Sequence, residues 1–288
     1  MNGWGRGDEA GQRPGRVAWL AFQAILVLWS LLVIVPVLWV FISSLKSPLE
    51  LFGSPWALPE APQWANFARA WTDAGLGRGF VNSLLVTAVS VTIIILLSAM
   101  AAYVLARFAF RGRTFLYYYF VGGLMLPYFL AMVPLFLLVN DLGLLNSYVG
   151  LILVYVAYSL AFTIFMLTGF FRTLPSELEE AAIIDGCSPF GVFWRIMLPL
   201  ARPGLVSAAI FNLVGIWNEY ILGFVLITDK RLFTLPLALA DLTLVQRYRT
   251  DWGALYAGVV ISIIPVMILY SLFQRRLIEG TTAGAVKG

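Results

Sequence analysis

Six long apolar stretches constrain the fold of this chain more than any other feature of its sequence. Each has at least the roughly 20 residues that a helix needs to cross the hydrocarbon core of a bilayer. Lipid offers no hydrogen-bond partner to the backbone, so a chain that crosses it repeatedly crosses as helices. The stretches are Val17–Ser43, Phe80–Ala106, Thr114–Val139, Tyr148–Phe171, Gly204–Ile227 and Gly253–Phe273. We therefore expect an all-α polytopic membrane protein with six transmembrane helices.

The composition agrees with a membrane protein and excludes several kinds of site. Of the 288 residues, 61% are hydrophobic and 12% are charged, whereas soluble domains carry about 25% charged residues. The chain has no histidine, and Cys187 is its single cysteine. This excludes histidine-dependent catalysis, internal disulfides and cysteine-based metal clusters, so we expect no catalytic residue and no metal site. The first apolar stretch is too long for the core of a signal peptide and is expected to remain as a helix.

The distribution of lysine and arginine predicts the orientation in the membrane. With the N-terminus in the cytoplasm, the inner segments hold 12 of the 19 basic residues and the outer segments hold 7, as the positive-inside rule requires. Both termini are then cytoplasmic. The predicted segments are an N-terminal tail at 1–16, a first transmembrane helix at 17–45, an outer segment at 46–79, a five-helix core at 80–273 with a cytoplasmic loop at 172–203, and a C-terminal tail at 274–288.

Four prolines lie inside the predicted spans, at Pro36, Pro127, Pro134 and Pro265. Each removes a backbone hydrogen bond and favours a kink in its helix. The kinks serve either the shape of the helices or a hinge that opens a path alternately to the two sides.

The loop between the fourth and fifth spans predicts two short helices. Ser176 and Glu179 have the spacing of a capping box, which makes Ser176 the N-cap of the first helix. Gly186 ends that helix, because glycine readily adopts the left-handed conformation of a C-terminal cap. Ser188 caps the second helix, with Pro189 at its first position. The second helix carries an apolar face at i, i+3, i+4 and i+7 and is closed by Pro199; the face consists of Phe190, Phe193, Trp194 and Met197.

This loop resembles the EAA loop of ABC importer permeases. The resemblance rests on Glu180-Ala181-Ala182, followed by Asp185-Gly186 and by Pro199. It implies the type I importer permease fold in the inner membrane of a bacterium, and an acidic first arm that docks in a cleft of a separate ATPase. In that role Glu180 supplies a charged contact, Ala181 and Ala182 allow close approach, and Gly186 makes the turn. The coupling residues implied are Glu180, Ala181, Ala182, Asp185, Gly186 and Pro199.

Other segments resemble the maltose-type carbohydrate permeases in particular. They are Trp217-Asn218-Glu219-Tyr220, Thr234-Leu235-Pro236-Leu237 and the ending at 280–288. The resemblance implies a heterodimer with a second, homologous permease, a dimer of ATPase subunits, a periplasmic or lipid-anchored solute-binding protein and a sugar substrate. It also implies that the tail reaches the ATPase through Ala285, Val286, Lys287 and Gly288.

One acid, Glu219, lies inside a predicted span, where an ionisable group usually faces a cavity or a partner. On a continuous helix it shares a stripe with Asn212, Gly215 and Gly223. The stripe lines the path, faces the partner permease, or makes a structural hydrogen bond. The residues proposed for the translocation path are Asn212, Asn218, Glu219 and Tyr220, although the resemblance implies that the partner permease makes most of the sugar contacts.

Three functions are compatible with a six-helix membrane protein. The first is a transport subunit driven by a separate ATPase, for a sugar or for another solute. The others are an ion-coupled secondary transporter, which usually shows inverted repeats and intramembrane charges, and a membrane scaffold or sensor. The chain lacks a P-loop to hold ATP phosphates, so the ATPase is expected to be another chain. We expect no cofactor in this chain, and ATP and Mg in the partner ATPase. The EAA-like loop favours the first function, and nothing indicates nucleic-acid binding.

Overall fold

The computed structural model describes residues 16–245 and 251–285, with side chains of residues 16, 18, 244–245 and 274–285 left aside. Within this part of the chain every regular element is a helix. The elements are α1 (Arg16–Ser44), α2 (Pro48–Gly53), α3 (Ala65–Thr72), α4 (Leu76–Arg107), α5 (Arg113–Met125), η1 (Tyr128–Ala131), α6 (Met132–Asp141), α7 (Tyr148–Thr173), α8 (Glu177–Ile184), α9 (Pro189–Val192), η2 (Phe193–Met197), α10 (Leu198–Leu200), α11 (Arg202–Trp217), α12 (Ile221–Leu226), η3 (Lys230–Leu232), α13 (Leu235–Val245) and α14 (Trp252–Ala285).

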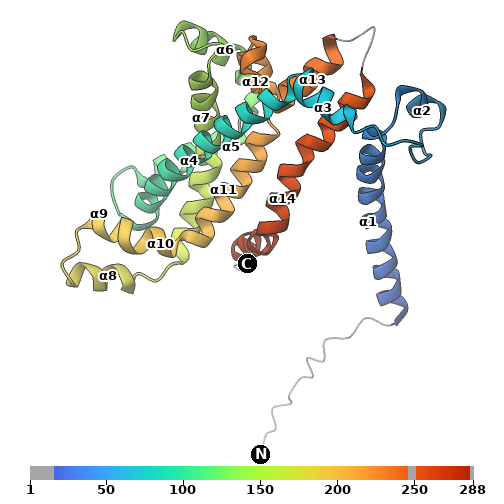
Figure 1. Cartoon of the computed structure of the whole chain (residues 1–288). Coiled ribbons are helices and arrows are strands. Elements are labelled where there is room, and N and C mark those ends of the chain that lie inside the picture. The colour runs from blue at the N-terminus through green and yellow to red at the C-terminus, as the bar shows by residue number, and fades with distance from the viewer. Residues whose placement is uncertain (1–15, 246–250, 286–288) are drawn as a thin grey trace, which may run out of the picture.

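The long helices form a bundle with a distinct structure at each end. Figure 1 shows α8, α9 and α10 as a hairpin at one end and α6, α12 and α13 at the other. We call these the hairpin end and the opposite end. Helix α1 begins and α14 ends on the side of the hairpin end (Figure 1), which agrees with the prediction that both chain ends lie on one side.

Helices α4 and α7 form the most extensive packing of the bundle. Small polar side chains on α4, among them Ser90 and Ser98, are fully buried, which lets neighbouring helices approach closely. One apolar cluster around Ile94 and Tyr155 fills the bundle toward the opposite end. A second, around Phe171 and Met197, joins the bundle to the hairpin.

Four of the six predicted spans are continuous helices long and apolar enough to cross a membrane: α1, α4, α7 and the first part of α14. The third prediction, a single kinked span, is wrong in detail. Helix α5 ends at Met125, and the chain turns by 91° into η1 and α6. The cause is Pro127, which disfavours helical geometry in the residue before it; Leu126 accordingly has φ −84° and ψ 118°.

The fifth prediction also needs correction, because α11 ends at Trp217 rather than continuing to Ile227. Helix α12 follows after a break at residues 218–220. Toward the hairpin end, α11 meets the α9–α10 arm at an angle of 72°. The described part of the chain therefore has four continuous candidate spans, or up to six if each bent pair is counted as one.

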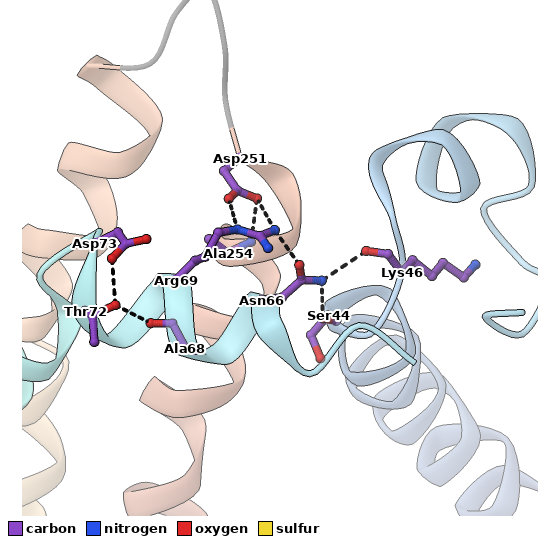
Figure 2. A network of polar contacts seen from close by, with 9 residues as sticks. All are labelled: Ser44, Lys46, Asn66, Ala68, Arg69, Thr72, Asp73, Asp251 and Ala254. Carbon is purple, nitrogen blue, oxygen red and sulfur yellow. Dashed lines mark hydrogen bonds and ion pairs between the residues drawn. The ribbon is translucent and has the colours of Figure 1, made fainter. Parts of the chain in front are cut away.

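Helix α1 stands beside the bundle and packs mainly on α14 (Figure 1). Its end is tied down by a polar network, which Figure 2 shows from close by. The buried Asn66 amide on α3 donates to the carbonyls of Ser44 (2.8 Å) and Lys46 (3.0 Å). Arg69 donates to Asn66 (2.6 Å) and to the Asp251 carboxylate (2.7 Å). The network thus joins α1, α3 and the start of α14.

The ion pair in this network has a predictable charge state. The guanidinium of Arg69 holds the pKa of the Asp251 carboxyl below its usual range, and that carboxylate raises the pKa of Arg69. Asp251 also accepts from the backbone N–H of Ala254 (3.0 Å), which caps the first turn of α14.

Asn66→Ala is expected to loosen the attachment of α1. It leaves two backbone carbonyls of a buried network without their donor, at a cost of about 1–3 kcal/mol. The measurement is the thermal unfolding midpoint of the purified permease in detergent. Thr72→Ala, on the exposed side of the same helix, is the matched control and should change stability by at most about 0.5 kcal/mol. Equal midpoints for the two variants would contradict the role of Asn66.

Candidate functional site

The hairpin is the first candidate site, and its turn has the predicted form. Gly186 has φ +84°, a backbone conformation that residues other than glycine rarely adopt. The Ser188 hydroxyl accepts from the backbone N–H of Gly191 at 3.2 Å, and Pro189 follows as the first helical residue. The helix–glycine–helix prediction is therefore confirmed.

The predicted capping box at Ser176 is absent. Ser176 is the N-cap of α8, but its side chain makes no capping hydrogen bond. Glu179 instead lies 2.8 Å from the Nε of Arg107 at the end of α4, with the two side chains only 16% and 13% exposed. The same guanidinium donates to the carbonyl of Leu174. A long-range ion pair has displaced the local capping interaction, and it fastens α8 to the end of α4.

Burial of the Glu179 carboxyl disfavours its charged form. Desolvation raises the pKa of the Glu179 carboxyl, while the neighbouring Arg107 charge opposes that rise. Removal of the arginine would therefore leave a partly buried carboxylate without its compensating charge.

The two faces of α8 differ in what they contact. Ala182 is 5% exposed and packs against the chain's own apolar cluster with Phe193 and Met197. Its small size thus serves the packing of the hairpin on the bundle. Glu180, Ala181, Asp185 and Gly186 are exposed, and Ile184 is 85% exposed. The free face of α8 therefore combines acidic and large apolar side chains.

The second arm departs from the prediction at two points. The expected single apolar face is divided, because Phe193 and Met197 are buried while Phe190 is largely exposed and Trp194 is half-exposed. Pro199 does not close the arm, which continues through Leu200. A π-helical turn at Phe193–Met197 precedes it. Such a wider turn accommodates the missing N–H and the bulk of a proline ring.

A cavity in the bundle is the second candidate site. It has a volume of about 890 Å³ and opens to the surface. Its walls come from α5, η1, α7, α11 and the 218–220 break, and they combine aromatic rings with a few polar groups. The polar and aromatic lining residues are Tyr128, Phe129, Tyr155, Tyr158, Ser159, Phe162, Phe211, Asn212, Asn218, Glu219 and Tyr220.

All four residues predicted for the path line this cavity, but the predicted helical stripe is wrong. Glu219 lies beyond the end of α11, and its carboxylate accepts from the backbone N–H groups of Leu222 (2.7 Å) and Gly223 (3.1 Å). It also accepts from the Tyr155 hydroxyl at 2.7 Å. Glu219 thus satisfies donors at the start of α12 that the break would otherwise leave unpaired.

The two asparagines hold different positions. Asn212 is buried and donates to the Thr163 hydroxyl (2.9 Å) and to the carbonyl of Ala208 (2.8 Å), so it joins α11 to α7. Asn218 is exposed at the cavity wall and donates to the carbonyl of Val214 at 2.8 Å. Of the predicted tail, Ala285 is the last residue of α14, and Val286, Lys287 and Gly288 lie outside the described residues.

Sequence reasoning missed the aromatic residues of the cavity and the role of Arg107. Tyr128, Tyr155, Tyr158 and Phe162 fall in apolar stretches, where an aromatic residue carries no local mark of a cavity. In the sequence, Arg107 counts only as one of the 12 basic residues on the predicted inner side, which indicate the orientation. The sequence did contain a signal for the Arg107–Glu179 pair. Arg107 follows the second predicted span and Glu179 follows the fourth, so both lie on the predicted inner side.

A model of the family described as "Binding-protein-dependent transport system inner membrane component" matches residues 94–282. The diacetylchitobiose uptake system permease protein NgcG of Streptomyces coelicolor is 47% identical, over 92% of this chain and 88% of its own length. The trehalose transport system permease protein SugB of Mycobacterium tuberculosis is 34% identical, over 94% and 97%.

A solved structure has the same fold. It is that of a bacterial ABC transporter involved in the import of the acidic polysaccharide alginate. One of its chains superposes with a TM-score of 0.82 at 23% identity, over 96% of this chain and 99% of that chain.

Arg107→Ala is expected to release the hairpin from α4. The variant leaves the partly buried Glu179 carboxylate unpaired, at a cost of about 3 kcal/mol. Limited proteolysis of the purified protein should show faster cleavage within residues 174–201, together with a lower unfolding midpoint. Arg111→Ala, which removes an exposed arginine from the turn between α4 and α5, serves as control. The exchange Arg107→Glu with Glu179→Arg should restore most of the protection, and a double variant as labile as Arg107→Ala would argue against the ion pair.

Proposed function

Because the chain belongs to the family of binding-protein-dependent transport system inner membrane components, we propose that it is the permease that forms half of the path for a sugar or oligosaccharide in an ABC importer. The family makes it a multi-pass protein of the bacterial inner membrane and a transport component rather than an enzyme. Such a component works with an ATPase and a solute-binding protein.

The observation that carries the proposal is the cavity of about 890 Å³ between α5, α7 and α11. Sugars present hydroxyl groups and apolar ring faces, which aromatic side chains and a few fixed polar groups recognise together. Tyr158, Phe162 and Tyr220 supply the rings, and Asn218 supplies an exposed amide. The relatives named for diacetylchitobiose and trehalose support a carbohydrate cargo.

We assign Glu219 to the shape of the cavity wall, since its carboxylate is engaged by Tyr155 and by the start of α12. Asn212, in the same way, joins two helices behind the wall. Of the four residues predicted for the path, Asn218 and Tyr220 are therefore the ones we propose to meet the solute.

The cavity opens to the surface, and we propose that this chain encloses only part of the path. A second, related permease in a heterodimer is the proposed other half.

We propose that the free face of α8 docks on the ATPase. Its exposed Glu180 and Ile184 suit a cleft with a basic rim and an apolar floor. ATP and Mg are then held by a dimer of ATPase subunits, and the residues Ala181, Asp185 and Gly186 shape the contact. Ala182 and Pro199 act within this chain, through the packing of the hairpin on the bundle. The tail residues Ala285, Val286, Lys287 and Gly288 are proposed as a second contact with the ATPase.

On the opposite side of the membrane, a periplasmic or lipid-anchored binding protein delivers the solute above the cavity. An ion-coupled secondary transporter is the weaker reading, because the one acid at the cavity wall is committed to structural hydrogen bonds.

Ile184→Glu tests the docking of α8. A carboxylate forced into an apolar contact costs several kcal/mol, so stimulation of the ATPase by the solute-loaded binding protein should fall by about tenfold or more. The assay is ATP hydrolysis and solute uptake by the assembled transporter in proteoliposomes. Arg111→Glu, a charge reversal elsewhere on the same side, is the control. Normal stimulation in the Ile184 variant would exclude this face as the ATPase contact.

Tyr158→Ala tests the cavity. Tyr158 is proposed to stack on the sugar, and loss of an aromatic contact of about 0.5–1.5 kcal/mol should lower uptake by up to about tenfold. Basal ATP hydrolysis should stay unchanged. Tyr119→Ala, which removes an exposed tyrosine from α5 outside the cavity lining, is the matched control. A panel of mono- and oligosaccharides then identifies the cargo. Uptake of an amino acid or peptide but no sugar would replace the carbohydrate assignment and leave the permease assignment intact.

A further inference from the structure

Residues 47–58 form a small projecting lobe at the end of α1, which we call the outer lobe. It consists of α2 and the turn that follows. Its surface is unusually apolar for a segment outside the bundle, because four large side chains project from it: Leu49 (87% exposed), Phe52 (69%), Trp56 (79%) and Leu58 (75%). A soluble surface rarely gathers so many exposed large apolar residues without a partner.

The polar groups of the lobe are turned to its own backbone. Lys46 is fully buried, and its ammonium group donates to the carbonyls of Ser54 (3.0 Å) and Pro55 (2.8 Å). Glu50 completes a capping box with Ser47 and accepts from the backbone N–H of Glu60 at 2.8 Å. A segment that meets lipid needs this internal satisfaction of its polar groups.

Aromatic contacts fix the lobe to the neighbouring membrane helices. Trp56 packs on Trp39 of α1, with ring centroids 5.7 Å apart, and the Trp39 indole donates to the Pro55 carbonyl at 3.0 Å. Trp39 also meets Tyr256 of α14, and Phe52 meets Trp252 at the start of α14. Tryptophan and tyrosine concentrate at the level where a bilayer meets water, and α1 below this level exposes apolar side chains throughout.

The position of the lobe favours lipid over the solute-binding protein as its occupant. Figure 1 shows α2 at the side of α1 that faces away from α5, α7 and α11, the helices that line the cavity. A binding protein that delivers a solute has to sit above the cavity, whereas the lobe lies beyond α1. Its apolar surface continues the apolar surface of α1 through the Trp39–Trp56 contact.

We propose that the outer lobe is a membrane-interface anchor, which inserts Phe52 and Trp56 at the boundary between headgroups and acyl chains of the leaflet opposite the hairpin. The lobe holds the depth of α1, whose packing within this chain is mainly on α14. Lys46 acts as the internal brace of the anchor, since its two carbonyl partners set the turn from which Trp56 projects.

Photo-crosslinking of the complete transporter tests this proposal. The photoreactive amino acid p-benzoylphenylalanine replaces Trp56 in one variant, Phe52 in a second and the exposed Ala61, which lies beyond the lobe, in a control. The transporter is irradiated in phosphatidylethanolamine–phosphatidylglycerol nanodiscs, with and without the binding protein. Mass spectrometry of this chain then distinguishes phospholipid adducts from links to protein.

We expect phospholipid adducts at both positions 52 and 56, several-fold more abundant than at position 61 and unchanged by the binding protein. Links from either position to the binding protein or to the second permease as the main product would overturn the proposal. So would a lipid yield at 52 or 56 no higher than at 61. Both lobe positions carry aromatic side chains, so the probe replaces a ring with a ring, and either variant that fails to assemble leaves the other to decide.

Discussion

The structure depends on one constraint: backbone N–H and C=O groups inside a bilayer need partners from the protein itself. A continuous helix pairs these groups within itself, whereas at each break in a helix other groups of the protein have to supply the hydrogen-bond partners. At the 218–220 break the Glu219 carboxylate takes the free N–H groups of Leu222 and Gly223. Near the start of α13, Asn82 of α4 donates to the carbonyls of Arg231 and Phe233. The break at residues 218–220 and the turn after Met125 both lie at the wall of the cavity, where the chain leaves the helix.

The cavity and the hairpin are connected by the same helices. Helix α7 contributes Tyr155 and Tyr158 to the cavity wall and ends at Thr173 beside the hairpin. Helix α4 packs along it and ends at Arg107, which holds the hairpin through Glu179. Tightly packed interiors are not easily compressed, so a displacement of α8 would be passed to α4 and α7 rather than absorbed between them. Helix α11, which also lines the cavity, joins the hairpin directly at an angle of 72°. A movement of the hairpin would therefore act on α11 as well.

Hydropathy and capping chemistry predicted most of this architecture, since both are local. The spans follow from runs of apolar residues, and the hairpin follows from Ser188, Pro189 and Gly186. What local patterns did not predict is pairing over distance. Glu179 has the spacing of a capping residue, yet it pairs with a residue 72 positions earlier in the chain. Pro127 indicated a kink, but not that the chain would turn by as much as 91° there. The cavity could be predicted only in part, because its polar residues stand out in an apolar stretch and its aromatic residues do not.

Basic residues at the ends of the membrane helices also make hydrogen bonds that hold the folded protein together. Lysine and arginine at the ends of membrane helices are usually read as signals for orientation. In this chain two of them donate to carbonyls where helices end or the chain turns: Arg113 to Leu105 and Ala106, and Arg107 to Leu174. The last carbonyls of a helix lack intrahelical donors and carry partial negative charge. A cation at such a place therefore orients the helix during insertion and fastens its end afterwards, so a neutral replacement that keeps the topology would still lose a contact that shapes the folded protein.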